Sequence, residues 1–189
     1  AASPLAVAAA IAAVATIVVI SVSGQPQAIA ADMELVLGTG SIKGKLFSAG
    51  NAISIASVLG GKGVKVYNYG TKGGKDNIKR ISKKKRAINF GFVTAADLGK
   101  AKPKQLKAIR GLMAVGKAKG KTVLLIVRNK APKKVSKEAY AAAVAQVVGI
   151  LKSKKGMSRV KAAWKGYSPS SGAADFKAAG VKLHKAAIM

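Results

Sequence analysis

The sequence lacks cysteine altogether and has a single histidine, His184. Without cysteine, the chain cannot form disulfides, thiolate nucleophiles or cysteine-ligated metal sites. One histidine does not supply a metal cluster or a Ser-His-Asp arrangement, and the acidic residues are not paired at catalytic spacing. We therefore expect no catalytic residue, no metal, no cofactor and no enzymatic activity.

Acidic residues are scarce: six Asp and Glu stand against 34 Lys and Arg, which gives a net charge of +28. Such a balance favours nucleic acid, anionic lipid or an acidic protein as a partner. However, 50% of the residues are hydrophobic, a high fraction for a protein that only coats nucleic acid. Nucleic-acid binding, for example as a ribosomal component, therefore stays an alternative hypothesis.

Aromatic residues are also few, at 5% of the chain, and they form no obvious platform on which bases would stack. The densest basic run can be interpreted as a binding patch for phosphate, lipid headgroups or RNA. A solvated helix end is the commoner meaning of such a run. The run consists of Lys79, Arg80, Lys83, Lys84, Lys85 and Arg86.

Charge is absent from residues 1–31, and an apolar run from Leu5 to Val22 is interrupted only by Thr16 and Ser21. As a helix this run spans about 27 Å, close to the hydrocarbon thickness of a bilayer. We predict a single-pass membrane anchor over residues 1–24 and a linker over residues 25–32. A secretory signal and a buried soluble helix are the alternatives. The anchor residues are Leu5, Ile11, Val14, Ile17, Val18 and Ile20.

Strand and helix patterns alternate between residues 33 and 97. Residues 34–37, 64–69 and 88–93 have the apolar patterns of strands, and residues 46–59 and 76–84 have those of helices. Alternation of this kind predicts a parallel sheet flanked by helices. A glycine loop, residues 38–44, connects the first strand to the first helix, where backbone amides attract anions.

The second half of the chain predicts two further strands, residues 109–115 and 122–127, joined by a lysine-rich hairpin or connection. Residues 116–122 resemble a phosphate loop, but they are one residue short and lead into a strand. Helices are predicted over residues 136–151, 158–165 and 171–179. Ser136 is expected to cap the first of them, and Gly180 to end the last. Residues 100–104 are predicted to be a basic loop.

The glycine loop does not have the pattern of a nucleotide site. Its spacing is G-x-G-x-x-x-G, and no acidic residue lies about 20 positions downstream to hold a ribose hydroxyl. Several segments nevertheless follow one another in a recognisable order. They are residues 37–44, Gly50-Asn51-Ala52-Ile53, residues 73–78, residues 87–93 with Asp97, residues 106–112, residues 123–128 and residues 171–181.

In this order the segments resemble the solute-binding proteins of TRAP transporters, specifically the TAXI group. The resemblance implies a periplasmic-binding-protein-like α/β fold, whose two lobes enclose a small organic acid. In this chain the stretch for a second lobe is absent, so residues 33–189 are predicted to form one lobe. The resemblance places any remaining ligand site at Gly38, Thr39, Gly40, Asn77 and Thr94.

One lobe cannot enclose a small molecule, because exclusion of water requires both faces of a cleft. We therefore predict a membrane-anchored structural or accessory subunit, whose partners are the membrane and other protein subunits. The host is expected to be a larger membrane complex, such as a photosynthetic reaction-centre–antenna assembly. A solute receptor that feeds a TRAP transporter is the main alternative.

The side of the membrane is less directly indicated. All Lys and Arg residues follow the apolar run, which by the positive-inside tendency favours a cytoplasmic domain. The small-residue segment Ala28-Ile29-Ala30 and the resemblance favour the extracytoplasmic, periplasmic side. We predict the latter.

Overall fold

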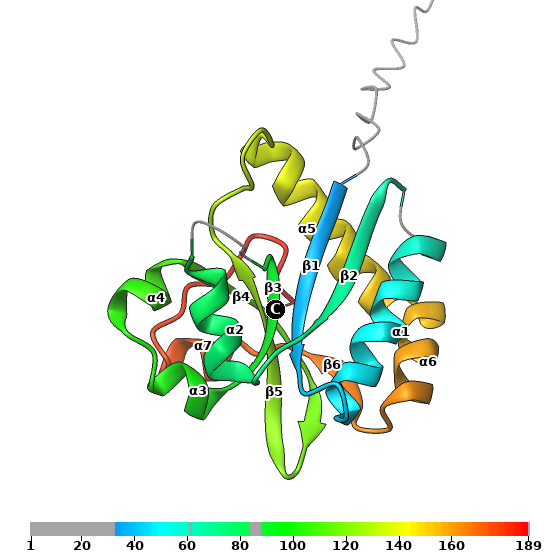
Figure 1. Ribbon diagram of the computed structural model, residues 1–189, viewed down its shortest axis with the longest axis horizontal. Helices are drawn as coiled ribbons and strands as arrows, with labels where there is room; N and C mark the ends of the chain where they lie inside the picture. Colours follow the sequence, from blue (N-terminus) through cyan, green and yellow to red (C-terminus); the bar gives the residue numbers. More distant parts are fainter. Residues whose placement is uncertain (1–32, 61, 84–87, 189) are drawn as a thin grey trace, which may run out of the picture.

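A computed structural model describes residues 33–60, 62–83 and 88–188 of the chain (Figure 1). The predicted anchor and linker lie outside these residues, as do Lys84, Lys85 and Arg86 of the basic run. Within them, no helix is long and apolar enough to cross a membrane. The elements are β1 (Met33–Gly40), α1 (Lys45–Gly60), β2 (Val64–Gly70), α2 (Gly74–Ile81), β3 (Phe90–Thr94), α3 (Ala95–Gly99), α4 (Pro103–Lys107), β4 (Ile109–Ala118), β5 (Lys121–Arg128), α5 (Lys137–Lys152), α6 (Lys154–Ala163), β6 (Tyr167–Ser170) and α7 (Ala173–Ala178).

The fold is mixed α/β, with a six-stranded mixed sheet in the order β2-β1-β3-β5-β4-β6. β1 pairs in parallel with both β2 and β3. β5 is antiparallel to β3 and to β4, and β4 is antiparallel to β6. The predicted parallel sheet is therefore correct for β2, β1 and β3 and wrong for the other half.

The reason for the antiparallel half is the connection between β4 and β5. Only Lys119 and Gly120 separate these strands, and both have positive φ angles, 49° and 73°. Two residues of this conformation form a tight hairpin, which is compatible only with antiparallel pairing. The lysine-rich segment is thus a hairpin, and it forces β5 to run antiparallel to β4.

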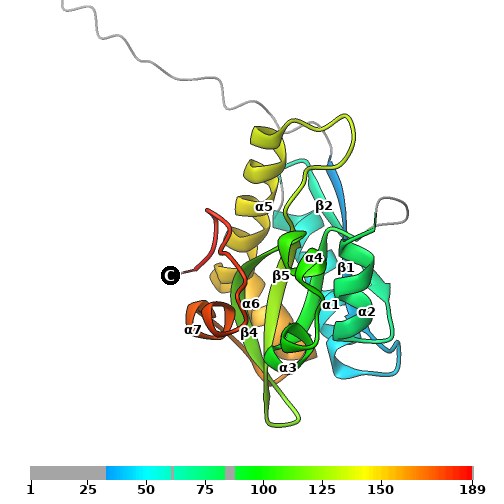
Figure 2. The same ribbon diagram turned by 90° about the vertical axis from the view of Figure 1, so that its left-hand side faces the viewer.

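Two groups of helices cover the sheet, one on each face (Figures 1 and 2). α1, α5 and α6 bury the larger apolar core with alternate residues of the strands, such as Leu35 and Leu125. α2, α3 and α7 cover the smaller core, which contains Leu124 and Phe176. The strands are buried on both faces, which explains why β5 is an almost continuous apolar run.

The first half of the chain forms the elements that its periodicity predicts, with small shifts at the ends. Ser136 caps α5 as expected, because its Oγ accepts a hydrogen bond of 3.0 Å from the Ala139 amide. Two predictions need correction, and two elements were missed. The helix predicted at 158–165 begins at Lys154, because the Ser153 hydroxyl caps it. The basic loop 100–104 continues into α4, with Pro103 in its first turn. β6 and α3 were not predicted.

The C-terminal segment after α7 returns to β4. His184 donates its amide to the carbonyl oxygen of Gly111 at 2.9 Å, and Ile188 donates to that of Leu112 at 2.9 Å. The imidazole Nδ1 of His184 accepts a hydrogen bond of 3.1 Å from the amide of Ala186. Burial lowers the pKa of His184, and the positive charges of Lys185 and Arg110 lower it further.

We expect acidification to loosen this segment. In the unfolded chain the pKa of histidine is about 6.5. Because the folded-state pKa is lower, the neutral imidazole contributes stability that is present above about pH 6.5 and is lost as the pH falls through the folded-state pKa. His184 is the one histidine of the chain, so its C2–H resonance can be titrated by NMR without ambiguity. A measured pKa at or above that of a free histidine would contradict the prediction.

Candidate functional site

The predicted ligand residues lie at one edge of the sheet, where β1, β2 and β3 all end. We call this the carboxyl edge. α1 packs on one face of the sheet and α2 on the other, so the connections from neighbouring strands diverge here. In open α/β sheets ligands bind at such a divergence. The prediction of a site therefore depends on which polar groups are free at this edge.

Thr39 faces α1 and is buried, with 1% of its surface exposed. Its hydroxyl donates to Oδ1 of Asn68 at 2.9 Å. The amide nitrogen of Asn68 donates in turn to the Phe47 carbonyl at 2.9 Å and to Oδ1 of Asn51 at 2.8 Å. This chain of hydrogen bonds ties β1 and β2 to α1, so the Thr39 hydroxyl is already used inside the fold.

Asn77 lies on the opposite face, on α2, and is completely buried. Its side-chain amide donates to the carbonyl oxygen of Gly38 at 3.0 Å and to that of Phe92 at 2.7 Å. It thereby joins the ends of β1 and β3. Its Oδ1 has no hydrogen-bond partner among the described residues and points at Gly38, where a β-carbon would lie 2.5 Å away. Gly38 and Asn77, both named as ligand residues, are thus in contact with each other as parts of the scaffold.

Thr94 caps α3 and makes a capping box with Asp97. Its hydroxyl donates to Oδ2 of Asp97 at 2.8 Å, and its amide donates to the same oxygen at 2.9 Å. Asp97 packs against Gly74 at the start of α2, where a β-carbon would overlap the carboxylate. Thr94 therefore fixes α3 beside α2. Thr39, Asn77 and Thr94 each belong to a separate internal network, and they do not converge on one space.

Beside the exposed lysines Lys43, Lys72 and Lys75, the carboxyl edge also exposes one large apolar side chain and one aromatic side chain. Ile42 in the glycine loop is 68% exposed, and Tyr69 is 45% exposed. Ile42 lies against Gly70, where a β-carbon would come within 2.7 Å of its Cγ2. The Arg80 guanidinium lies over the Tyr69 ring, 5.2 Å from its centre. We call Ile42, Tyr69 and Arg80 the loop-tip patch.

Arg80 is held in this patch by an ion pair with Asp76, at 2.9 Å. Burial raises the pKa of Asp76, but hydrogen bonds from Arg80 and from the Lys72 amide outweigh it, so the pKa is lowered. Of the predicted basic run, Lys79 and Lys83 are exposed, while Arg80 contacts its own neighbours. The described part of the run thus fits a solvated helix end with one structural arginine.

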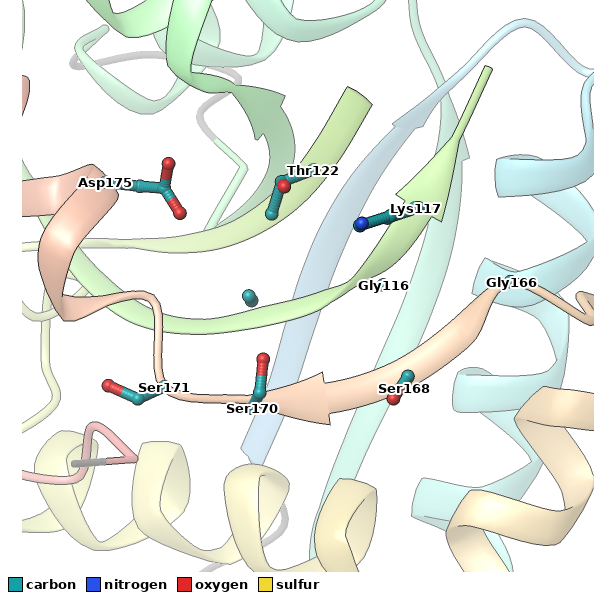
Figure 3. A pocket seen from close by; sticks show the side chains of 9 residues that line it. Gly116, Lys117, Thr122, Gly166, Ser168, Ser170, Ser171 and Asp175 are labelled. Atoms are coloured by element: carbon teal, nitrogen blue, oxygen red, sulfur yellow. The ribbon is translucent and has the colours of Figure 1, made fainter. Parts of the chain in front are cut away.

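A second feature is a hollow of about 430 Å³ between β4, β6 and the start of α7 (Figure 3). Lys117 extends its ammonium group towards it from β4, and Asp175 of α7 lies across from Lys117. Thr122 and Ser170 provide hydroxyl groups between them. The hollow is lined by Ala114, Gly116, Lys117, Thr122, Gly166, Ser168, Ser170, Ser171 and Asp175.

Close approach of two backbone segments shapes this hollow. Gly116 has a φ of 143°, and a β-carbon there would overlap the Gly166 carbonyl oxygen. The Lys117 amide donates to that oxygen at 3.0 Å. β6 therefore meets β4 through a bulge. Bulges commonly redirect side chains at the edges of sheets.

Sequence reasoning missed the hollow entirely. One signal was present: Ser168 and Ser170 alternate around Pro169, so a strand there places both hydroxyls on the same face. Among the residues that the structure describes, no group of three or more His, Asp or Glu side chains is placed to hold a metal ion.

Comparison with known proteins does not assign the chain to a family. No protein-family model matches the chain, and no curated protein matches it.

Proposed function

We propose that this protein is a membrane-anchored, extracytoplasmic accessory subunit of a larger membrane complex, derived from a TRAP-type solute receptor. One observation carries the proposal. The hydroxyls of Thr39 and Thr94 and the amide nitrogen of Asn77 are used in hydrogen bonds within the fold. The isoleucine and the tyrosine of the loop-tip patch, which lie beside them, are exposed.

With these polar groups hydrogen-bonded inside the fold, the carboxyl edge suits a protein partner better than a small organic acid. To bind a solute, the Thr39 hydroxyl and the Asn77 amide nitrogen would first have to leave their hydrogen bonds, and buried polar groups left unpaired cost about 1–3 kcal/mol each. Oδ1 of Asn77 has no partner among the described residues, but it is buried against Gly38. The loop-tip patch, by contrast, offers an exposed isoleucine and a tyrosine held under an arginine. Tyrosine and arginine are enriched among the residues that dominate binding energy at protein interfaces.

The membrane part of the proposal depends on the sequence. The proposed anchor, residues 1–24, lies within the uncharged residues 1–31, and the small-residue segment before Ala31 supports an extracytoplasmic domain. β1 begins at Met33, so the domain follows the anchor after a short linker. A short linker keeps the domain near the membrane, where it meets other subunits of the same bilayer.

The test is to purify the full chain from its native membranes in mild detergent and to identify the subunits that migrate with it. We expect a defined set of membrane subunits with the unaltered chain. Ile42→Ser combined with Tyr69→Ala is expected to weaken this association by about tenfold or more, because both residues belong to the patch. Val58→Ser is the matched control, because Val58 is 57% exposed but lies on α1.

Two results would contradict the proposal. One is a chain that purifies alone from membranes in which it is abundant. The other is equal loss of association in the patch variant and in the Val58→Ser control. The receptor alternative makes a different prediction, namely that a small organic acid raises the unfolding temperature of the chain.

A further inference from the structure

The hollow between β4, β6 and α7 combines opposite charges and hydroxyl groups. Figure 3 shows the Lys117 ammonium on one side and the Asp175 carboxylate on the other, with Thr122 and Ser170 between them. Asp175 and Thr122 are partly buried, while Lys117 and Ser170 are open to solvent. The space of about 430 Å³ is large enough for a small metabolite.

The Asp175 carboxylate differs from the carboxylates of three other described acidic residues, which have partners within the fold. Asp76 pairs with Arg80, Asp97 accepts hydrogen bonds from Thr94, and Glu34 accepts one from Tyr67. The Asp175 carboxylate makes no hydrogen bond or ion pair with any residue in the described part of the chain, as is also true of the exposed Glu138 side chain; unlike Glu138, Asp175 lines the hollow. In a protein with 34 Lys and Arg, a carboxylate that has no cationic partner and faces a hollow is available to a ligand.

The hydroxyl groups beside Asp175 are available too. The side chains of Thr122, Ser168 and Ser170 have no hydrogen-bond partner within the described residues. Ser171 uses its Oγ to accept from the Ala173 amide, at 3.2 Å. The hollow therefore offers one anionic group, one cationic group and several neutral donors and acceptors in one place.

These charges select a ligand class. The net charge of +28 draws anions towards the protein and repels simple cations. Inside the hollow, however, Asp175 repels an anion unless the same molecule carries a positive group. We propose that the hollow binds a small zwitterion, with its ammonium group at Asp175 and its carboxylate at Lys117 and the neighbouring hydroxyls. This inference is independent of the proposed function, because the hollow and the loop-tip patch share no residue.

The probes are amino acids of increasing length, H₃N⁺–(CH₂)n–COO⁻, from glycine to 6-aminohexanoate. Butanoate and butylammonium serve as compounds with one charge each. Binding to the full chain in mild detergent is measured by calorimetry and by NMR shifts of the Gly116, Gly166 and Ser170 amides. We expect at least one zwitterion to bind more tightly than either single-charge compound, because only the zwitterion satisfies both charged side chains.

Two variants locate the binding. Asp175→Asn and Lys117→Gln are each expected to weaken zwitterion binding by about tenfold or more, the effect of losing a charge-assisted hydrogen bond. Glu138→Gln and Lys119→Gln are the matched controls, because they make the same charge changes at exposed positions outside the hollow. The amide spectra show whether each variant keeps its fold.

Three outcomes would overturn the inference. None of the zwitterions binds at millimolar concentration; butanoate binds as tightly as the best zwitterion; or the hollow variants and the control variants lose affinity to the same extent. The third outcome would mean that net charge, rather than this pair of residues, attracts the ligand.

Discussion

Replacing Asn77 with aspartate is expected to destabilise the fold by about 3–5 kcal/mol at neutral pH. The side chain is fully buried, and its amide nitrogen donates to two backbone carbonyls, those of Gly38 and Phe92. A carboxylate of the same shape would place a negative charge against both oxygens with no cation nearby. Since typical domains are stable by about 5–15 kcal/mol, this loss is a large fraction of the total.

The pH dependence distinguishes a charge effect from a packing effect. Burial raises the pKa of the introduced carboxyl, so the folded chain keeps its proton to higher pH than the unfolded chain does. The loss in the free energy of unfolding should be smallest below about pH 3.9, the pKa of an unfolded aspartate. It should grow as the pH rises from there. A loss that is the same at every pH would contradict this explanation.

Asn51→Asp is the matched control for this substitution. Asn51 is exposed on α1, and its Oδ1 is an acceptor from Asn68, a role that a carboxylate keeps. Unfolding is followed by the fluorescence of Trp164, the one tryptophan, which is 4% exposed. We expect the control to change stability by less than about 0.5 kcal/mol, as for most surface substitutions.

Replacing Gly116 with alanine is expected to destabilise the protein by about 3 kcal/mol or more. Its φ of 143° lies in a region that L side chains rarely adopt. In addition, the β-carbon would overlap the Gly166 carbonyl oxygen, which is backbone and cannot turn away. To relieve this overlap, β6 would have to move away from β4. That movement would break the hydrogen bond from the Lys117 amide to the Gly166 carbonyl oxygen.

Gly149→Ala is the control for Gly116→Ala, and its effect on stability should have the opposite sign. Gly149 lies inside α5, its φ is not positive, and a β-carbon added there would have no neighbouring atom within 4 Å. Alanine there is expected to stabilise the protein by about 0.5–1 kcal/mol, because it restricts the unfolded chain and favours the helix. Thermal unfolding of both variants in mild detergent measures the difference. A Gly116→Ala protein that unfolds at the temperature of the unaltered chain would refute the prediction.

The predicted ligand site shows which features of the protein could not be deduced from its sequence. The resemblance named Gly38, Thr39, Asn77 and Thr94 as ligand residues, and in the structure they lie at one edge of the sheet. The sequence did not indicate that Thr39 bonds to Asn68, on one face, while Asn77 bonds to Gly38 and Phe92 on the other. Such partners are distant along the chain and meet only after the strands have paired.

By itself the sequence determined the local elements, because hydrophobic period, capping residues and turn residues act over a few positions. It therefore specified β1 to α2, the Ser136 cap of α5 and the strands β4 and β5, but it left their lysine-rich link open as a hairpin or a longer connection. The tertiary structure decided which strands are neighbours, which polar side chains are used within the fold and where Asp175 faces Lys117. Those outcomes depend on contacts between segments that are far apart in the chain. The energies of such contacts cannot be deduced from the pattern of neighbouring residues.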